Sequence, residues 1–180
     1  LGFLSAETLA RFRGRKPLWI HAVSVGEVFL ALKLVEALRE AAPDRPVVLS
    51  TTTTTGFRVA AEKESPSLTV IHNPVDLPWI AWHVLRSIDP VALVLVEAEI
   101  WPNLVALAKR RGIPVLLANA RLSPRSERRY RKARALVAPV FSLLDGVTVP
   151  FPEDAARWSA LGVEAAKIAV TGSVKFDNSG

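Results

Sequence analysis

The sequence contains no cysteine among its 180 residues. This absence excludes a disulfide framework, a thiolate metal site and a cysteine nucleophile. The three histidines stand far apart, at positions 21, 72 and 83, without the close spacing of metal ligands, so we expect no metal site. No apolar run approaches the roughly 18 residues of a membrane-spanning helix, and no signal peptide is visible.

Two fingerprints of nucleotide-binding loops are also missing. The chain has no Gly-x-Gly-x-x-Gly segment, which argues against a nicotinamide-dependent dehydrogenase. It has no P-loop either, because no Gly-Lys-Ser or Gly-Lys-Thr follows the threonine-rich segment at 51–56. Half of the residues are hydrophobic, which is enough to bury a core. The length is typical of one domain, or of one large domain with an incomplete second one.

Positive charge is concentrated in one segment of the chain. The formal net charge is +6, and residues 121–134 carry seven basic side chains against one acidic side chain, Glu127. The rest of the chain carries equal numbers of basic and acidic residues. Such a segment predicts an anionic partner, which can be lipid headgroups, phosphates or nucleic acid. The alternative is a solvated helix face without a partner.

Short β-branched runs alternate with longer amphipathic stretches. The predicted strands are Pro17–Ala22, Pro46–Ser50, Leu68–Ile71, Val91–Val96, Val115–Ala118, Gly146–Val149 and Ile168–Val170. The predicted helices are Glu27–Glu40, Phe57–Glu64, Pro78–Ser87, Pro102–Arg111, Arg125–Leu144 and Glu153–Leu161. This alternation predicts an α/β fold, a Rossmann-like doubly wound parallel sheet with helices on both faces. We interpret residues 1–16 as a polar lead-in, residues 1–177 as one domain and residues 178–180 as the start of a linker.

Glu27 is the most informative candidate on the predicted ligand side of the sheet, where the strands end. It follows a strand and a turn of small residues, and it lies in the first turn of a predicted helix. The positive end of the helix dipole favours its ionised form. An ionised carboxylate in this place can take a proton from a substrate. The alternative is that Glu27 only complements the dipole.

Other loops on the same side carry polar side chains. The threonines of 51–56 offer hydroxyls for phosphate or sugar, or else form a polar turn with a helix cap. Glu97 and Glu99 would share a face of a continuing strand and can divide acid–base or electrostatic roles, unless they pair with basic neighbours such as Arg121. Asn119 and Arg121 can grip a phosphorylated or sugar ligand.

Three further residues have more ordinary interpretations. Lys175 lies just past the last predicted strand and can neutralise a leaving phosphate, or is an ordinary surface lysine. Asp76 is expected to cap the helix that follows it. Trp101 is interpreted as a core anchor.

These loops together resemble one family, the 3-deoxy-D-manno-octulosonic acid (Kdo) transferases of lipopolysaccharide assembly. Each piece alone is weakly specific, but six occur in the same order, from about residue 17 to 177, and each falls on a predicted ligand-side loop. The matching pieces are His-Ala-Val-Ser-Val-Gly-Glu (21–27), Thr-Thr-Thr-Thr-Gly (52–56), Pro-Val-Asp-Leu-Pro (74–78), Glu-Ala-Glu-Ile-Trp-Pro-Asn (97–103), Asn-Ala-Arg-Leu-Ser-Pro-Arg-Ser (119–126) and Val-Thr-Gly-Ser-Val-Lys-Phe-Asp (170–177). Two departures, Ala98 for a common Thr and Val174 for a common Leu, touch no residue expected to do chemistry.

The resemblance implies the N-terminal, acceptor-binding half of a GT-B glycosyltransferase. The parent enzyme would transfer Kdo from CMP-Kdo to a lipid A precursor with inversion, at the cytoplasmic face of the bacterial inner membrane. Its donor CMP-Kdo would be held by a C-terminal domain, and an anchor would precede Leu1; neither lies in these 180 residues. We therefore predict that the isolated chain does not turn over. No cofactor and no metal are implied.

The resemblance also assigns roles to residues. Glu27 would be the general base, and Glu97 and Lys175 would stabilise the transition state. Substrate binding is assigned to Ser24, Gly26, Thr53, Thr55, Gly56, Glu99, Asn119 and Arg121. The basic segment Arg121–Arg134 would meet the anionic membrane surface. Two alternatives stay open, another GT-B-like sugar-nucleotide enzyme and a basic nucleic-acid-binding module. We expect no nucleic acid, because Tyr130 is the only aromatic residue among the arginines of 121–134 and no nucleic-acid-binding motif appears.

Overall fold

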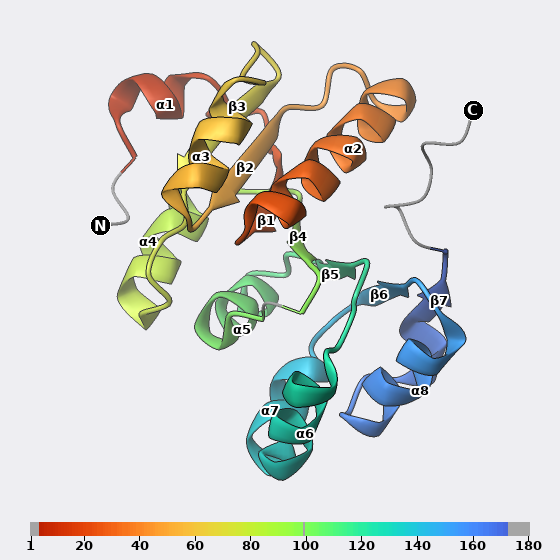
Figure 1. Cartoon of the computed structure of the whole chain (residues 1–180). Helices are drawn as coiled ribbons and strands as arrows, with labels where there is room; N and C mark the ends of the chain where they lie inside the picture. The colour runs from red at the N-terminus through yellow and green to blue at the C-terminus, as the bar shows by residue number, and fades with distance from the viewer. Residues whose placement is uncertain (1–3, 99, 173–180) are drawn as a thin grey trace, which may run out of the picture.

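A single sheet of seven parallel strands organises the chain (Figure 1). The computed structural model describes residues 4–98 and 100–172. The strand order is β3-β2-β1-β4-β5-β6-β7. The strands are β1 (Leu18–Ala22), β2 (Val47–Thr51), β3 (Leu68–His72), β4 (Ala92–Val96), β5 (Val115–Ala118), β6 (Gly146–Val149) and β7 (Ile168–Val170). The sequence predicted every one of them to within one residue at either end, and the doubly wound parallel sheet is confirmed.

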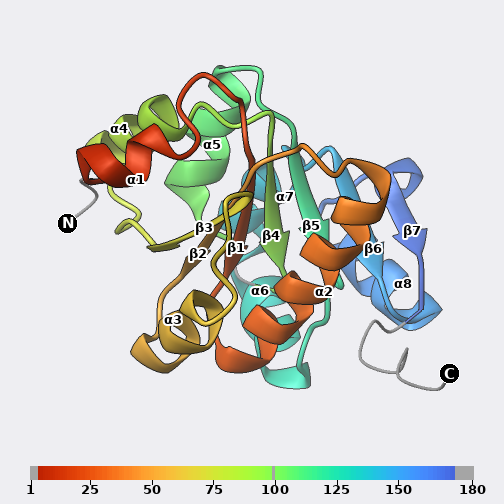
Figure 2. The same cartoon turned by 90° about the horizontal axis from the view of Figure 1, so that it is seen from above.

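Helices cover both faces of this sheet. They are α1 (Ala6–Ala10), α2 (Val25–Ala41), α3 (Thr54–Ala61), α4 (Pro78–Ile88), α5 (Pro102–Arg110), α6 (Pro124–Lys132), α7 (Arg134–Phe141) and α8 (Pro152–Ala160), with a 3-10 turn at Ala165–Lys167. Figures 1 and 2 show α2 and α3 on one face, and α5 to α8 on the other. The apolar core is accordingly split by the sheet into two clusters. One includes Ile20, Val28 and Leu49, and the larger one includes Trp19, Leu95 and Leu104.

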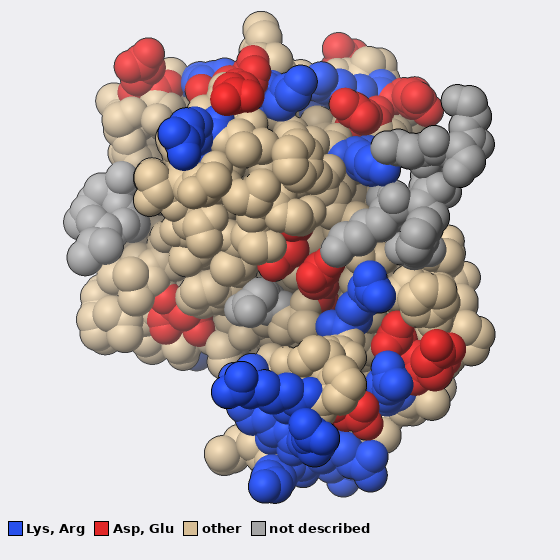
Figure 3. Space-filling view, viewed as in Figure 1, with Lys and Arg blue, Asp and Glu red and all other residues tan. Residues whose placement is uncertain are grey.

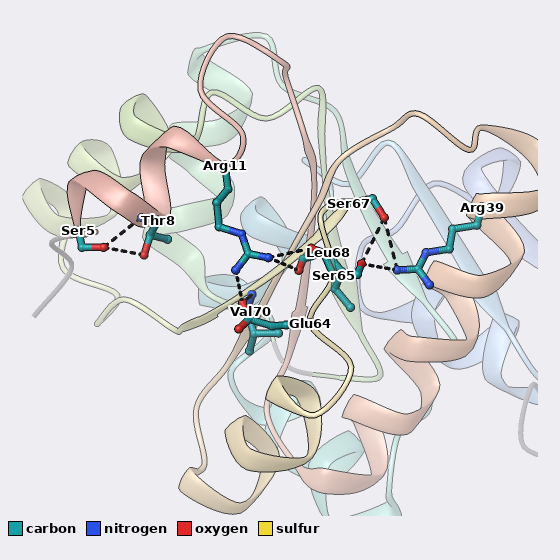
Figure 4. Close-up of polar contacts among 9 residues, drawn as sticks. All are labelled: Ser5, Thr8, Arg11, Arg39, Glu64, Ser65, Ser67, Leu68 and Val70. Atoms are coloured by element: carbon teal, nitrogen blue, oxygen red, sulfur yellow. Dashed lines mark hydrogen bonds and ion pairs between the residues drawn. The ribbon is translucent and has the colours of Figure 1, made fainter.

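The N-terminal segment corrects the sequence prediction of a polar lead-in. Residues 6–10 form a short helix capped by Ser5, and Phe12 is buried in the larger core cluster. Arg11 ties this segment to the connection before β3 (Figure 4). Its guanidinium pairs with Glu64 at 2.9 Å and donates to the carbonyl oxygens of Ser65 and Leu68 at 2.7 and 3.3 Å. The buried ring of Phe12 and the hydrogen bonds of Arg11 therefore fix a segment whose composition is mostly polar.

The predicted long helix at 125–144 was also wrong, because two helices occupy this segment. The helical path breaks at Ala133, which has φ −96° and ψ 18°. The two parts face different surroundings: α6 has no buried residue, whereas α7 buries Phe141. The break allows the basic part to stay in solvent while the apolar part packs against α5 and the larger core cluster.

Candidate functional site

The direction in which successive strands are added to the sheet reverses between β1 and β4. These strands are neighbours, with His21 paired to Leu95, yet the helices that follow them, α2 and α5, pack in the clusters on opposite faces of the sheet. In open α/β sheets, ligands bind outside the carboxyl ends of the strands at such a switch point. The loops that follow β2, β1, β4 and β5 stand next to one another in this order. They carry Thr53, Glu97 and Asn119, and Glu27 follows the loop after β1 in the first turn of α2. The fold therefore brings these predicted site residues to one edge.

The loop before α2 holds the side chain of Glu27 in place. It is the third residue of α2, and its backbone N–H donates to Oγ of the N-cap residue Ser24 at 3.3 Å. In return, the Ser24 hydroxyl donates to Glu27 Oε1 at 2.9 Å, and the Val23 N–H donates to Oε2 at 2.8 Å. This reciprocal arrangement is a variant of the capping box, in which the Glu27 carboxylate reaches the N–H of Val23, one residue before the N-cap, and the hydroxyl of Ser24. It fixes the direction of the carboxylate of Glu27, a residue that is only 7% exposed.

Glu97 and Asn119 share an unusual backbone conformation at the ends of neighbouring strands. Their φ angles are +60° and +52°, in the left-handed region that non-glycine residues seldom occupy. The Glu97 N–H donates to the Ala118 carbonyl at 2.9 Å, and the Asn119 N–H donates to Thr148 Oγ1 at 3.0 Å. Asn119 is 2% exposed, and neither atom of its carboxamide has a hydrogen-bond partner within the described part of the chain.

The threonine loop has the helix cap that its sequence allowed. Thr53 is the N-cap of α3, and its hydroxyl accepts from the Gly56 N–H at 3.1 Å. Thr53 and Thr55 are exposed, whereas Gly56 is buried. A Cβ on Gly56 would lie 2.7 Å from Thr51 Oγ1 and 2.8 Å from Thr53 Oγ1. The glycine therefore allows the close approach of α3 to the end of β2, next to the accessible hydroxyls.

Arg121 and the basic helix α6 border the same edge. Arg121 is exposed and lies over the ring of Phe151, 5.8 Å from its centroid. Figure 3 shows lysine and arginine side chains gathered over α6 and α7. Tyr130 of α6 donates to the carbonyl oxygen of Ala98 at 3.3 Å, in the loop that follows β4. The basic helix is therefore attached to the loop that carries Glu97.

A buried polar group lies beneath this edge, on the strands themselves. His21 Nδ1 is 2.9 Å from Ser50 Oγ, and Trp19 Nε1 donates to the same hydroxyl at 2.8 Å. The His21 ring meets Trp101 edge-on with centroids 5.4 Å apart. Burial lowers the pKa of His21 to about 4, although a hydrogen bond with the backbone of Ser50 acts in the opposite direction. His21 is therefore neutral at pH 7, and it supports the Trp101 ring that packs against the core.

Asp76 caps a different helix from the one that the sequence predicted. Its carboxylate accepts from the backbone N–H groups of Asn103 at 3.1 Å and Leu104 at 2.8 Å, at the start of α5. Asn103 Nδ2 returns a bond to the Asp76 carbonyl at 2.8 Å. The physical reason is that α5 starts with Pro102, has no side-chain cap of its own and leaves these two donors open. The N-cap of α4 is Leu77, without a side-chain bond.

Five of the predicted site residues are accessible to solvent, and two lie outside the residues that the structure describes. Ser24, Gly26, Thr53, Thr55 and Arg121 are exposed at the site edge. Glu99 and Lys175 lie outside the described residues, as does the predicted domain boundary at 177. Within residues 4–98 and 100–172, no three His, Cys, Asp or Glu side chains are grouped as metal ligands. In the same residues no helix has the length and apolar character to cross a bilayer.

Sequence reasoning missed three features of this edge. The His21–Ser50 contact joins two neighbouring strands, so only the strand register reveals it. The role of Asp76 depends on α5, which is distant in sequence. A signal for it was present, because Pro102 marks the start of this helix and the preceding residue, Trp101, cannot cap it. Phe151 had no signal beyond its place in the loop after β6.

Comparison with known proteins gives a consistent set of matches. The family model described as 3-deoxy-D-manno-octulosonic-acid transferase (kdotransferase) matches residues 1–178. The 3-deoxy-D-manno-octulosonic acid transferase of Haemophilus influenzae is 33% identical over 160 residues, which are 89% of this chain and 38% of the relative. The enzyme of the same name from Bordetella pertussis is 37% identical over 167 residues, with the same shares. The chain thus spans about two fifths of the length of these relatives.

Solved structures share the fold at low sequence identity. A Staphylococcus aureus MnaA–UDP structure has a TM-score of 0.62 at 14% identity, over 88% of this chain and 45% of that chain. The structure of MurG from Acinetobacter baumannii has a TM-score of 0.59 at 14% identity, over 91% of this chain and 47% of that chain. These likenesses show the Rossmann-like fold of one half of a GT-B protein.

Proposed function

The chain belongs to the 3-deoxy-D-manno-octulosonic-acid (Kdo) transferase family, and we propose that it is the acceptor-binding half of an enzyme that transfers Kdo from CMP-Kdo to a lipid A precursor. The observation that carries this proposal is the place of Glu27, fixed in a capping box at the switch point of the sheet. A C-terminal domain outside these 180 residues would supply the donor-binding surface.

The proposed reaction is a single displacement with inversion at the anomeric carbon. A hydroxyl of the acceptor attacks the Kdo carbon while the bond to the CMP phosphate breaks, and the hydroxyl proton passes to a base. Glu27 is that base in this proposal. Support comes from its fixed orientation, its low exposure and its place in the first turn of α2, which follows β1 and adjoins the loop of Glu97.

Transition-state stabilisation is assigned to Glu97 and Lys175. Inversion at a sugar passes through an oxocarbenium-like centre, which a nearby carboxylate stabilises. An ammonium group offsets the charge that develops on the departing phosphate. The left-handed backbone of Glu97 supports the first role, because strained residues of this kind cluster at functional sites.

Acceptor binding is assigned to polar groups on the loops around these carboxylates. Ser24, Gly26, Thr53, Thr55 and Gly56 lie on the side of β1 and β2, and Glu99, Asn119 and Arg121 follow β4 and β5. The exposed guanidinium of Arg121 is chemically fitted to a phosphate of the acceptor. The buried carboxamide of Asn119 supports a polar contact, because a buried amide without a partner is costly.

The basic segment Arg121–Arg134 is assigned to the anionic membrane surface. Its arginines and lysine are exposed, and α6 is joined to the Glu97 loop through Tyr130. Each basic residue close to such a surface contributes about 1 kcal/mol of attraction. A lipid-linked acceptor would then be presented beside the carboxylates. This arrangement belongs at the cytoplasmic face of the bacterial inner membrane.

Vesicle binding tests the membrane part of the proposal. The variant Arg128→Gln/Arg129→Gln/Arg131→Gln should bind vesicles with anionic lipid at least tenfold more weakly than the unchanged chain at low salt, and the difference should shrink as salt rises. The matched control changes three arginines far from α6, Arg13, Arg15 and Arg45, and should bind normally. Equal binding of both variants contradicts a membrane role for the segment.

Transfer itself is tested by CMP release. The full-length parent enzyme, given CMP-Kdo and a lipid A precursor, should release CMP in step with acceptor glycosylation. The 180-residue chain alone should not. If the parent releases no CMP with any lipid A precursor, or the isolated chain turns over alone, the proposed function is wrong.

A further inference from the structure

Three aromatic rings, one from each of the helices α6, α7 and α8, are in contact. Tyr130 and Phe141 meet edge-on with ring centroids 5.4 Å apart, and Phe141 and Trp158 meet at the same distance. Phe141 and Trp158 are buried, and Tyr130 packs against the same core cluster. Edge-to-face pairs at this spacing add to the stability gained from burial. This aromatic chain of Tyr130, Phe141 and Trp158 therefore joins α6 to α8 through α7.

Tyr130, at one end of the aromatic chain, is bonded to the loop that carries Glu97. Its hydroxyl donates to the carbonyl oxygen of Ala98, the residue directly after Glu97, at 3.3 Å. On the other side of the turn, the Glu97 N–H donates to the carbonyl oxygen of Ala118 at 2.9 Å. Glu97 has φ +60°, a conformation that persists in a non-glycine residue only where the surroundings fix it. Hydrogen bonds on both sides of Glu97 do so.

Trp158, at the other end, is bonded to the loop that carries Asn119. Its indole Nε1 donates to the carbonyl oxygen of Ala120, the residue directly after Asn119, at 3.2 Å. The N–H groups of Asn119 and Ala120 donate to Thr148, the first to its hydroxyl at 3.0 Å and the second to its carbonyl oxygen at 2.7 Å. Asn119 has φ +52°. Each of these two left-handed turns therefore has an aromatic donor on the carbonyl group that follows it.

We propose that Tyr130 and Trp158 are positioning residues of the site. Tyr130 sets the direction of the Glu97 side chain, and Trp158 sets that of Asn119, each by fixing the peptide group that follows. Precise placement matters because a shift of about 1 Å in a reacting geometry can lower a rate on the order of 100-fold. The inference rests on the proposed function, in which Glu97 stabilises the transition state and Asn119 binds the acceptor. The two donors should therefore affect different kinetic constants.

Small substitutions in the full-length parent enzyme test the two roles. Tyr130→Phe removes one hydroxyl and keeps the ring that packs on Phe141. Trp158→Phe keeps an aromatic ring and removes the N–H donor. The matched control is Ser142→Ala, which removes a hydroxyl that donates to the carbonyl oxygen of Pro139 at 3.0 Å, at the end of α7 rather than in a site loop.

With CMP-Kdo and a lipid A precursor, Tyr130→Phe should lower kcat for CMP release at least fivefold and leave KM for the acceptor unchanged. Trp158→Phe should raise KM for the acceptor at least fivefold, and Ser142→Ala should change neither constant. When Glu97→Gln is already present, adding Tyr130→Phe should lower kcat less than twofold, because residues that act through one group are not additive. If Trp158→Phe does not fold, the two Tyr130→Phe comparisons decide the proposal.

A normal kcat for Tyr130→Phe overturns the proposal, and so does a further fivefold loss on top of Glu97→Gln or an equal loss in Ser142→Ala. Amide hydrogen exchange separates this failure from failure of the proposed function. The Glu97 amide of the parent should exchange at least tenfold faster in Tyr130→Phe and at the same rate in Ser142→Ala. Unchanged exchange in Tyr130→Phe overturns the proposal. Faster exchange in a parent that releases no CMP contradicts the proposed function, and leaves Tyr130 as the residue that fixes this loop.

Discussion

Glu97 and Asn119 follow directly on the register-paired residues Val96 and Ala118, and both have a left-handed backbone. Two adjacent strands therefore end in the same sharp turn at the switch edge of the sheet. Asparagine tolerates this conformation better than most residues, whereas glutamate has no such preference. The shared turn is the feature that places a carboxylate and a carboxamide side by side on neighbouring loops.

Substitution of Asn119 separates the role of its backbone from that of its side chain. Asn119→Gly keeps the left-handed turn at low cost, whereas Asn119→Ala should lower the unfolding free energy by roughly 1–2 kcal/mol. If the carboxamide binds the acceptor, both variants should bind it at least tenfold more weakly. Acceptor titration and denaturant unfolding measure the two effects. Normal acceptor binding by Asn119→Gly would restrict this residue to a backbone role.

Two glycines near helix starts should respond in opposite ways to a methyl group. Gly56→Ala places a Cβ within 2.8 Å of two threonine hydroxyls and should cost about 1–3 kcal/mol of unfolding free energy. Gly26→Ala is the matched change in α2, where the Cβ would meet only Ser24 Oγ at 3.9 Å. It should be neutral or stabilise by up to about 1 kcal/mol. Urea unfolding of both variants checks this contrast, and similar losses would contradict the close packing at Gly56.

Stability should fall in acid because His21 is buried without charge. Burial lowers the pKa of His21 from its ordinary value of 6.5 to about 4. The unfolded chain takes up a proton as the pH falls through 6.5, whereas the folded chain does so only near 4. The contribution of His21 is therefore complete above 6.5, and declines by roughly 3 kcal/mol as the pH drops from 6.5 to about 4.

Comparison with His21→Gln isolates this effect from the other titrating groups. Unfolding free energies of both proteins are measured by denaturant at several values between pH 4 and 8. The unchanged chain should lose more stability than the variant across the lower half of this range. Parallel pH profiles would show that His21 takes up its proton equally in the folded and unfolded states.

The strands could be predicted because their signals are local. Runs such as Val91–Val96 are apolar throughout and are bounded by proline or polar loops, as buried parallel strands are. Pro78, Pro102 and Pro152 marked helix starts for the same reason, since proline fits the first helical turn. The break at Ala133 has no comparable signal, because it depends on which part of the segment packs against the core.

The candidate site was predicted as a set of loops, but its internal geometry was not. The Ser24–Glu27 spacing of a capping box was visible in the sequence, and the structure has the reciprocal bonds. The contact of Asp76 with α5 and that of His21 with Ser50 join segments distant in sequence. Such contacts are set by strand order and register, which local patterns do not specify.

Glu27→Gln in the full-length parent enzyme is the most direct test of the proposed mechanism. Glutamine at this position preserves the form of the capping box but cannot accept the proton. With CMP-Kdo and a lipid A precursor, kcat for CMP release should fall at least about 100-fold, while acceptor binding and the unfolding free energy change little. Glu36→Gln, an exposed change on the same helix, should keep normal turnover. Near-normal kcat for Glu27→Gln would contradict the assignment of Glu27 as the base.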